Sequence, residues 1–156
     1  MFVSHKPAFT LIELLVVIAI ISILATIGLA SFQTARLKAR DATRKSDLQT
    51  ISKSLEAYVN DYQSFPISSS GKIVCQPPAT ICAYGAPFQD SKATIYVAKL
   101  PSDPVMDQTY YYESDGTKFT LYAHLENSQD SSIDNTIVTS CGSQTCNYQL
   151  KSTNQL

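Results

Sequence analysis

The sequence offers few side chains that could carry out chemistry. It contains only two histidines, His5 and His124, and no phosphate-binding loop, dinucleotide fingerprint, Gly-x-Ser-x-Gly motif or metal-spaced histidine pair. His124 lies within a predicted strand, where a half-exposed structural residue is commoner than a general base. Acidic residues near turns, such as Asp103 and Asp115, are the types that turns use. We therefore predict that the protein is not an enzyme and has no cofactor and no metal site.

The cysteines are the other candidates for chemistry: Cys75, Cys82, Cys141 and Cys146. Their C-x6-C and C-x4-C spacings lack the C-x2-C pair of zinc ribbons. We expect disulfides, for which three connectivities are possible, and pairing between sequence neighbours is the simplest. Because disulfides persist in oxidising compartments, we predict that this part of the chain lies outside the cytoplasm.

Glu13 stands at the start of a long apolar stretch. From Leu14 to Ala35 no residue is charged, and most are Ile, Leu, Val or Ala. The stretch lacks strand-like alternation, so we predict a helix, long enough at about 1.5 Å per residue to span a bilayer core of roughly 30 Å. A carboxylate in such a helix costs free energy. It is either a boundary acid that reaches the headgroups or an acid retained for a partner cation.

The residues before this helix suggest such a cation. A secretory signal peptide would be cut after its apolar core, near Ala25 or Ala30, and the helix would be lost. Cleavage between Ala8 and Phe9 would instead leave the helix at the new N-terminus. The α-amino group of Phe9 would then lie about one helical turn from Glu13, in the same chain or in a neighbouring copy.

Lys6, followed by Phe9-Thr10-Leu11-Ile12-Glu13-Leu14-Leu15 and the apolar run, resembles the class III leader and methylation motif of type IV pilins and type II secretion pseudopilins. The resemblance implies that a prepilin peptidase cleaves between Ala8 and Phe9 and methylates the Phe9 amine. It also implies that Glu13 pairs with the Phe9 amine of an adjacent subunit during filament assembly. The family usually has Gly before the cut, and often has Gly and Pro within the helix, where this chain has Ala8, Ser22 and Ala30.

The helical pattern continues to about Tyr62. Residues 32–63 contain no Pro or Gly, and Phe65-Pro66 is expected to end the helix. Apolar side chains recur at spacings of three and four, as on one face of an amphipathic helix: Leu48, Ile51, Leu55, Tyr58 and Tyr62. Between Arg36 and Asp47 there is no comparable stripe, so we expect that part to be wetted or covered by other subunits.

Basic residues gather just beyond the apolar run: Arg36, Lys38, Arg40, Arg44, Lys45 and Lys53. This patch can face anionic lipid, contact DNA, or form a solvated helix face paired with acids of neighbouring subunits. We favour the third interpretation. The formal net charge is −1, so the whole chain is not a polycation, and DNA is only a weakly supported partner.

The rest of the chain predicts a small β domain. Residues 66–90 are rich in Pro, Gly and Ser and are expected to form a long loop without a strong element. Residues 109–113 and 118–125 flank an Asp115-Gly116 turn, a strong hairpin signal. A short strand is expected at residues 137–138. The apolar face of the second hairpin strand is expected to pack on the helix stripe: Phe119, Leu121, Ala123 and Leu125.

The order of these features also resembles major-pseudopilin domains, in which a long helix packs on a small antiparallel sheet. The resemblance includes Tyr62-Gln63-Ser64-Phe65-Pro66 and Leu100-Pro101-Ser102-Asp103-Pro104. Many such pseudopilins bind calcium in a loop after the hairpin, but residues 125–130 show no matching run of acids, so no calcium site is expected. The disulfide-closed C-terminus looks more like that of a pilus pilin.

We therefore expect an α+β, pilin-like fold. It comprises a leader at residues 1–8, a transmembrane and assembly helix at 9–35, an amphipathic continuation at 36–65 and a loop-rich β domain at 66–156. The expected function is that of a structural subunit of a type IV pilus-like helical filament. Its monomer is expected in the cytoplasmic membrane with the C-terminal domain outside the cytoplasm, before it joins a surface or periplasmic filament.

Expected partners are copies of the chain, minor pilins, a prepilin peptidase and an assembly platform. One alternative function is that of the major pseudopilin of a type II secretion system. The other is a membrane-anchored extracytoplasmic binding module that never assembles.

Overall fold

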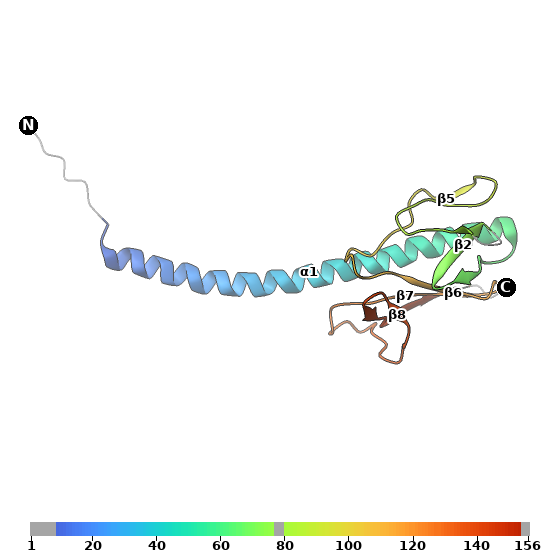
Figure 1. The fold of residues 1–156 in the computed structure, drawn as a ribbon. Coiled ribbons are helices and arrows are strands. Elements are labelled where there is room, and N and C mark those ends of the chain that lie inside the picture. The colour runs from blue at the N-terminus through green and yellow to red at the C-terminus, as the bar shows by residue number, and fades with distance from the viewer. Residues whose placement is uncertain (1–8, 77–79, 154–156) are drawn as a thin grey trace, which may run out of the picture. The chain divides into compact units, whose positions relative to one another are not determined.

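The computed structural model describes residues 9–76 and 80–153, and the chain divides into two compact units, Met1–Leu37 and Lys38–Leu156. One helix, α1 (Leu11–Tyr62), begins in the first unit and ends in the second (Figure 1). The leader predicted at residues 1–8 lies outside the described residues.

The end of α1 lies just before Phe65-Pro66, as the sequence predicts. Tyr62 is the last helical residue, and Gln63 has a left-handed φ of 53° while its N–H donates to the Val59 carbonyl at 2.8 Å. A left-handed residue commonly ends a helix because it turns the chain away from the helix axis. Phe65 then enters the core with only 2% of its surface exposed.

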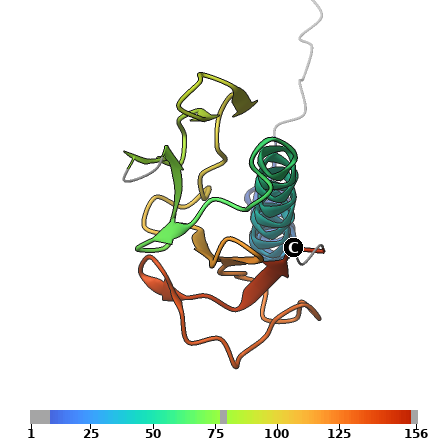
Figure 2. The same cartoon turned by 90° about the vertical axis from the view of Figure 1, so that its right-hand side faces the viewer.

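The strands of the second unit are short and antiparallel, and they gather on one side of α1 when the helix is viewed end-on (Figure 2). One sheet has the order β1-β2-β3 and consists of β1 (Ser68–Ser69), β2 (Lys72–Gln76) and β3 (Thr80–Ile81). Another has the order β10-β7-β6 and consists of β6 (Tyr111–Ser114), β7 (Phe119–Ala123) and β10 (Tyr148–Lys151). Two hairpins complete the set: β4 (Phe88–Gln89) with β5 (Ile95–Val97), and β8 (Ser140–Cys141) with β9 (Gln144–Thr145).

The core lies between the apolar stripe of α1 and the central strand β7. Leu48, Ile51 and Leu55 are fully buried, and β7 alternates between buried and partly exposed side chains. Phe119, Leu121 and Ala123 form the buried face. The predicted hairpin and its packing on the helix stripe are therefore confirmed, and the fold is the expected α+β pilin-like fold.

Two local predictions about the β domain are wrong. Residues 66–90 are not a featureless loop, because β2 carries Ile73 and Val74, 1% and 2% exposed, into the core. Ile73 and Val74 are β-branched residues, which are enriched in strands, but they stand in a segment rich in Pro and Gly. The strand expected at residues 137–138 is absent, and Val138 is 93% exposed. The strand begins instead at Ser140, next to the disulfide.

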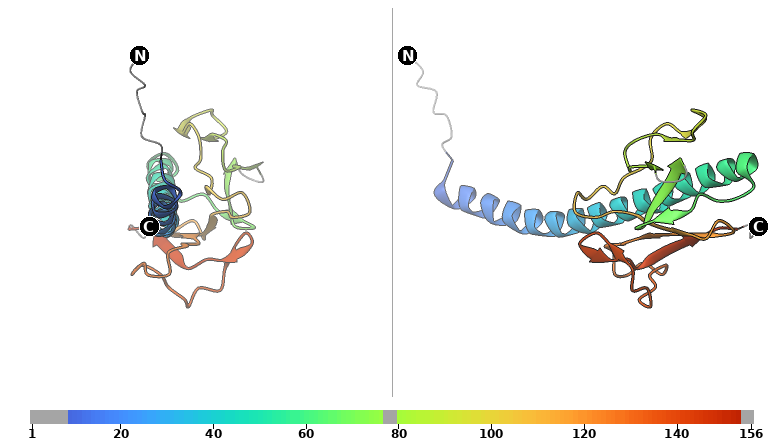
Figure 3. Two further views of the ribbon diagram at one scale, coloured as in Figure 1. Left: turned by 90° about the vertical axis from the view of Figure 1, so that its left-hand side faces the viewer. Right: turned by 45° about the vertical axis from the view of Figure 1, so that its right-hand side comes forward.

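The β4–β5 hairpin is fastened to the last turns of α1 by Asp90. Its carboxylate accepts the Tyr62 hydroxyl at 2.8 Å and the backbone N–H groups of Lys92 and Thr94 at 2.9 and 2.8 Å. Burial raises the pKa of Asp90, but these hydrogen bonds outweigh it and lower the pKa to about 2. The hairpin and the β8–β10 region lie on opposite sides of the second unit (Figure 3).

Candidate assembly segment and ionic cluster

The N-terminal end of α1 is closed by a reciprocal pair of hydrogen bonds between Thr10 and Glu13. The Thr10 backbone N–H donates to Glu13 Oε2 at 2.8 Å, and the Glu13 N–H donates to Thr10 Oγ1 at 3.3 Å. The Thr10 hydroxyl also donates to Glu13 Oε2 at 2.8 Å. This is a capping box, and its sequence signature is the Thr-x-x-Glu spacing of Thr10 and Glu13, which was not among the predicted features. Glu13 is thus held at the start of the helix, three residues from Thr10.

The predicted processing residues are placed only in part. Ala8 lies outside the described residues, whereas Phe9 directly precedes the cap and is 83% exposed. Glu13 is four residues further along the chain, and its carboxylate bonds back to the residue after Phe9. A positive charge on the Phe9 nitrogen would therefore lie next to a carboxylate already turned toward the chain start.

The surface of α1 that follows Glu13 is apolar and uncovered. Every described large apolar side chain from Leu11 to Phe32 is 46–81% exposed. By length and composition this part of the helix is apolar enough to cross a membrane, and none of its described side chains is buried within the chain. So large an exposed apolar surface marks a segment that is covered by lipid or by another protein.

Three of the six residues of the basic patch, Arg40, Arg44 and Lys45, form ion pairs within their own chain, so the preferred prediction of pairing with neighbouring subunits is wrong for these residues. Arg44 is fully buried. Its Nε and Nη2 donate to the two oxygens of Asp103 at 2.8 and 3.0 Å. Its Nη1 donates to Asp41 at 2.9 Å and to Glu126 at 2.6 Å, and its Nη2 also donates to Gln108 at 3.1 Å. All the N–H donors of the guanidinium group are therefore used.

Asp41 and Arg40 extend this ionic cluster, which we define as Arg40, Asp41, Arg44, Asp103 and Glu126. The Asp41 carboxylate accepts the backbone N–H groups of Glu126 and Asn127 at 2.9 and 2.8 Å. Arg40 Nε donates to Glu126 Oε1 at 2.8 Å. The cluster joins α1 to the loop before β6 and to the loop after β7. The stretch between Arg36 and Asp47, expected to be wetted or covered by other subunits, thus contains the buried Asp41 and Arg44.

The charges of the cluster reinforce one another. Burial lowers the pKa of Arg44, but hydrogen bonds to Asp103 and Glu126 outweigh it and raise that pKa above its ordinary value. The hydrogen bond from Arg40, followed by that from Arg44, lowers the pKa of Glu126 to about 2. Arg40, Arg44 and Glu126 therefore remain ionised at neutral pH.

A second ion pair lies one residue beyond Arg44. Lys45 Nζ donates to both oxygens of Asp130 at 2.8 Å and to Ser132 Oγ at 3.1 Å. The Tyr148 ring lies 5.4 Å from the same nitrogen. The hydrogen bond from Lys45 lowers the pKa of Asp130. The loop that follows β7 is thus organised by a side-chain cation of the chain itself.

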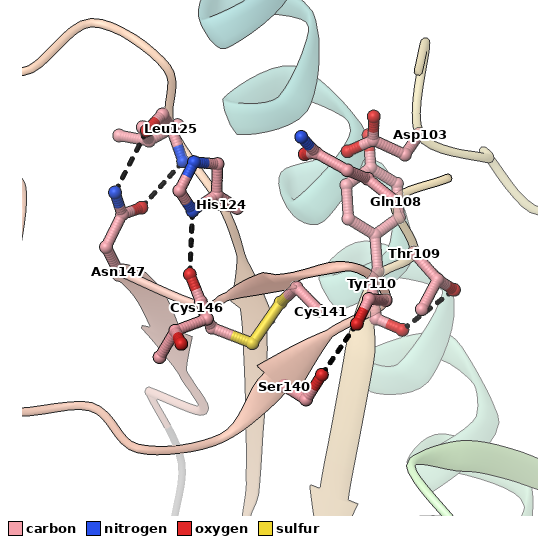
Figure 4. The surroundings of a disulfide bond; sticks show 12 residues. Asp103, Gln108, Thr109, Tyr110, His124, Leu125, Ser140, Cys141, Cys146 and Asn147 are labelled. Atoms are coloured by element: carbon pink, nitrogen blue, oxygen red, sulfur yellow. Dashed lines mark hydrogen bonds between the residues drawn. A yellow bond between two sulfur atoms is a disulfide. The ribbon is translucent and has the colours of Figure 1, made fainter. Parts of the chain in front are cut away.

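The structure joins Cys75 to Cys82 and Cys141 to Cys146. The second disulfide closes the β8–β9 hairpin, as Figure 4 shows. His124 Nδ1 lies 2.7 Å from the Thr145 carbonyl, which can only accept, so this nitrogen carries the proton. On the other side, the Thr109 N–H donates to the Cys141 carbonyl at 3.2 Å. A Cβ at Gly142, whose φ is +83°, would collide with the backbone oxygen of Asp107.

Comparison with known proteins shows which family the chain belongs to. Residues 4–29 match the family model of the prokaryotic N-terminal methylation motif. The chain is 30% identical over 135 residues to type II secretion system core protein G of Pseudomonas aeruginosa, covering 84% of this chain and 91% of that protein. It is 33% identical over 124 residues to type IV major pilin protein PilE1 of Neisseria gonorrhoeae, covering 78% and 71% respectively.

Core protein G of Escherichia coli is 28% identical over 101 residues, covering 65% of this chain and 68% of that protein. No solved structure matches the chain significantly. The two stronger matches extend well beyond the apolar segment and so include the β domain. The chain belongs to the family of type IV pilins and type II secretion pseudopilins.

Proposed function

We propose that this chain is a structural subunit of a type IV pilus-like helical filament. The observation that carries the proposal is a helix whose described large apolar side chains from Leu11 to Phe32 are uncovered and whose start holds the carboxylate of Glu13. Lipid covers that surface in the membrane-anchored monomer, and the helices of other copies cover it in the filament. Such a contact joins two different surfaces of identical subunits and does not close, which generates fibres.

Glu13 supplies the register of this assembly. A subunit placed one step out of register would leave a carboxylate buried in apolar surroundings without a cation, which is strongly unfavourable. The Phe9 amine of an adjacent subunit is the cation that we propose, created by cleavage between Ala8 and Phe9 and then methylated. A prepilin peptidase performs both steps, and an assembly platform with minor pilins completes the set of proposed partners. The family is one of structural proteins, and we propose no catalytic role for the chain.

Mass spectrometry of sheared surface material tests the processing. A chain that begins with N-methylated Phe9 and lacks four hydrogens, two for each disulfide, supports cleavage, export and filament membership together. A chain that keeps Met1 and stays in the membrane fraction would show that Ala8 prevents cleavage. The proposal would then fail in favour of a membrane-anchored binding module.

Substitution of Glu13 tests the register. We expect Glu13→Val to insert in the membrane normally and to lose most filaments, counted by electron microscopy of cells. The matched control is Asp107→Val, which removes an exposed carboxylate from the β domain and should leave filament number unchanged. Normal filament numbers in Glu13→Val would refute the role of this carboxylate.

A second candidate function is favoured by the relatives named type II secretion system core protein G, one of which is covered over 91% of its length. In that case the chain would be the major pseudopilin of a secretion system and would build a short periplasmic fibre. Deletion of the chain separates the two functions. Loss of surface filaments with normal secretion supports the pilus subunit, whereas loss of secreted proteins without loss of surface filaments supports the pseudopilin.

A further inference from the structure

The internal ion pairs leave only part of the basic patch for an external partner. Arg40, Arg44 and Lys45 are paired with Glu126, Asp103 and Asp130. Within the described part of the chain, Arg36, Lys38 and Lys53 make no ion pair. Arg36 and Lys38 follow the uncharged run that ends at Ala35, whereas Lys53 comes 15 positions after Lys38 in the sequence.

Arg36 contacts one particular neighbour, the ring of Phe32. The guanidinium carbon lies 5.7 Å from the ring centroid, and both side chains are exposed, Phe32 by 60%. Helical side chains lean toward the N-terminus, so the Arg36 side chain extends back over the last turn of the apolar run. An Arg side chain whose stem lies along apolar surface at the end of an apolar helix, with its charge at the headgroups, suits a membrane–water boundary.

We propose that Phe32 and Arg36 form an interfacial anchor that binds the phosphate groups of phospholipid headgroups while the chain is a membrane monomer. The phosphates belong to the leaflet on the side of the β domain. The inference rests on the proposed function only in that it takes the apolar part of α1 as the membrane segment. It adds a lipid contact that assembly must break, because a subunit that enters a filament leaves the headgroup layer.

Depth along the helix supports this partner. Arg36 follows Glu13 by 23 positions, or roughly 35 Å at the standard rise, whereas the hydrocarbon core is about 30 Å thick and the bilayer with headgroups about 40–45 Å. With Arg36 among the phosphates of one leaflet, Glu13 therefore lies at the opposite boundary of the hydrocarbon. The anchor would set the depth of Glu13 in the bilayer before it pairs with the amine of another subunit.

The placement of Lys38 favours a layer of anions over a single anionic partner. Two positions of a helix correspond to about 200° around its axis, so the sequence spacing of Arg36 and Lys38 is that of opposite helix faces. One carboxylate of a neighbouring subunit, or one strand of DNA, would meet only one of them. A headgroup layer surrounds the helix and meets both.

A tryptophan reporter can test the anchor, because the chain contains no tryptophan. Phe32→Trp keeps an aromatic ring beneath Arg36. The full chain would be reconstituted in phosphatidylcholine vesicles with or without phosphatidylglycerol, with bromine placed either near the headgroups or near the bilayer centre. We expect stronger quenching by the shallow bromine, and a further shallow shift when phosphatidylglycerol is present.

Further substitutions in the Phe32→Trp chain test whether Arg36 and Lys38 hold the ring at this depth. Arg36→Gln, and more so Arg36→Gln with Lys38→Gln, should shift quenching toward the deep bromine and abolish the response to phosphatidylglycerol, while the matched control Lys53→Gln should behave as the parent. Unchanged depth in the double variant, or an equal change in the control, would overturn the proposal. So would loss of the response upon addition of inorganic phosphate, which would indicate an anion site rather than a headgroup layer.

The same variants separate this inference from the proposed function. Filaments can be counted in cells that carry Arg36→Gln with Lys38→Gln. A depth effect in vesicles supports the anchor even if the wild-type chain forms no filaments, an outcome that would refute only the proposed function. Filaments that form normally while the vesicle assay shows no depth effect would refute only the anchor.

Discussion

Arg44 and Asp103, separated by 59 positions, are joined by two parallel hydrogen bonds of 2.8 and 3.0 Å and are both almost completely buried. This bidentate pair connects α1 to the loop that precedes β6. The same Asp103 carboxylate accepts the Val105 N–H at 2.8 Å, so it also fixes the conformation of its own loop. Asp103 stands in a Leu-Pro-Ser-Asp-Pro segment and has the sequence context of a turn residue. In the structure it anchors the β domain to the helix.

Removal of Arg44 should destabilise the second unit strongly. Arg44→Met leaves Asp103 and Asp41 buried without their cation, and breaking a buried pair in this way costs about 3–5 kcal/mol. Urea unfolding of the full chain in detergent, followed by near-ultraviolet circular dichroism, measures this loss. Lys53→Met is the matched control, since Lys53 is exposed and should change stability by less than about 0.5 kcal/mol. Equal stability of the two variants would show that the cluster adds nothing.

Acid should weaken the same cluster over a defined range. The pKa of Glu126 is lowered from 4.5 to about 2, chiefly by Arg40 and then Arg44. Because the folded-state pKa is the lower one, the contribution of Glu126 is complete above about pH 4.5 and is lost as the pH falls toward 2. Unfolding free energies measured between pH 6 and pH 2 should therefore fall more steeply for the wild type than for Glu126→Gln. If the unfolding free energies of the wild type and Glu126→Gln changed with pH in parallel, the predicted contribution of ionised Glu126 to stability would be contradicted.

The helical half of the fold follows from simple patterns in the sequence. The uncharged run, the stripe of Leu48, Ile51 and Leu55, and the Asp115-Gly116 turn predict α1 and the β6–β7 hairpin because each is a local signal. The buried face of α1 was predicted to begin at Leu48, but in the structure it begins closer to the N-terminus, at Asp41. Asp41 and Arg44 continue the stripe at the same spacing of three and four, but charged residues are normally placed outside.

The ionic cluster could not be predicted in full because its partners are distant in sequence. Asp103 and Glu126 come from two different loops, and no local pattern identifies which acid meets which base. The capping box was different, since Thr10 and Glu13 are three residues apart and carry its signature. The prediction that Glu13 pairs with an external amine did not include this contact within the chain.

Each disulfide should contribute a modest part of the stability. The paired cysteines are separated by seven and five positions, and loops this short give about 2 kcal/mol each on the chain-entropy model. Cys75→Ser with Cys82→Ser, and the corresponding pair at Cys141 and Cys146, should each lose about that amount in urea unfolding. The second pair should lose more if the close approach of Gly142 to Asp107 depends on the closed hairpin. No loss in either double variant would contradict the predicted contribution.

The end of α1 offers a stabilising substitution. Gln63 is held at a φ of 53°, a left-handed conformation that costs a residue with a Cβ about 1 kcal/mol and costs glycine almost nothing. Gln63→Gly should therefore raise the unfolding free energy by about 0.5–1 kcal/mol, although it gives up the 3.3 Å bond from the Gln63 side chain to the Asn60 carbonyl. Asn60→Gly, in the last turn of the same helix, is the matched control and should lower stability by about 0.3 kcal/mol, the difference between the helix propensities of Asn and Gly. A destabilised Gln63→Gly variant would show that the side-chain bond outweighs the backbone strain.

The capping box predicts that Thr10 acts through Glu13. Thr10→Ala removes the hydroxyl that both caps the Glu13 N–H and donates to the Glu13 carboxylate, which should loosen the first turn of α1 by about 1 kcal/mol. Amide hydrogen exchange of the full chain in micelles should then be about fivefold faster in that turn, and the Glu13 side chain should lose its fixed orientation. Thr26→Ala is the matched control, since the Thr26 hydroxyl donates to the Ile23 carbonyl within the helix and takes no part in the cap. If Thr10→Ala exchanges at the wild-type rate, the cap does not hold Glu13, and the carboxylate must be oriented by the neighbouring subunit alone.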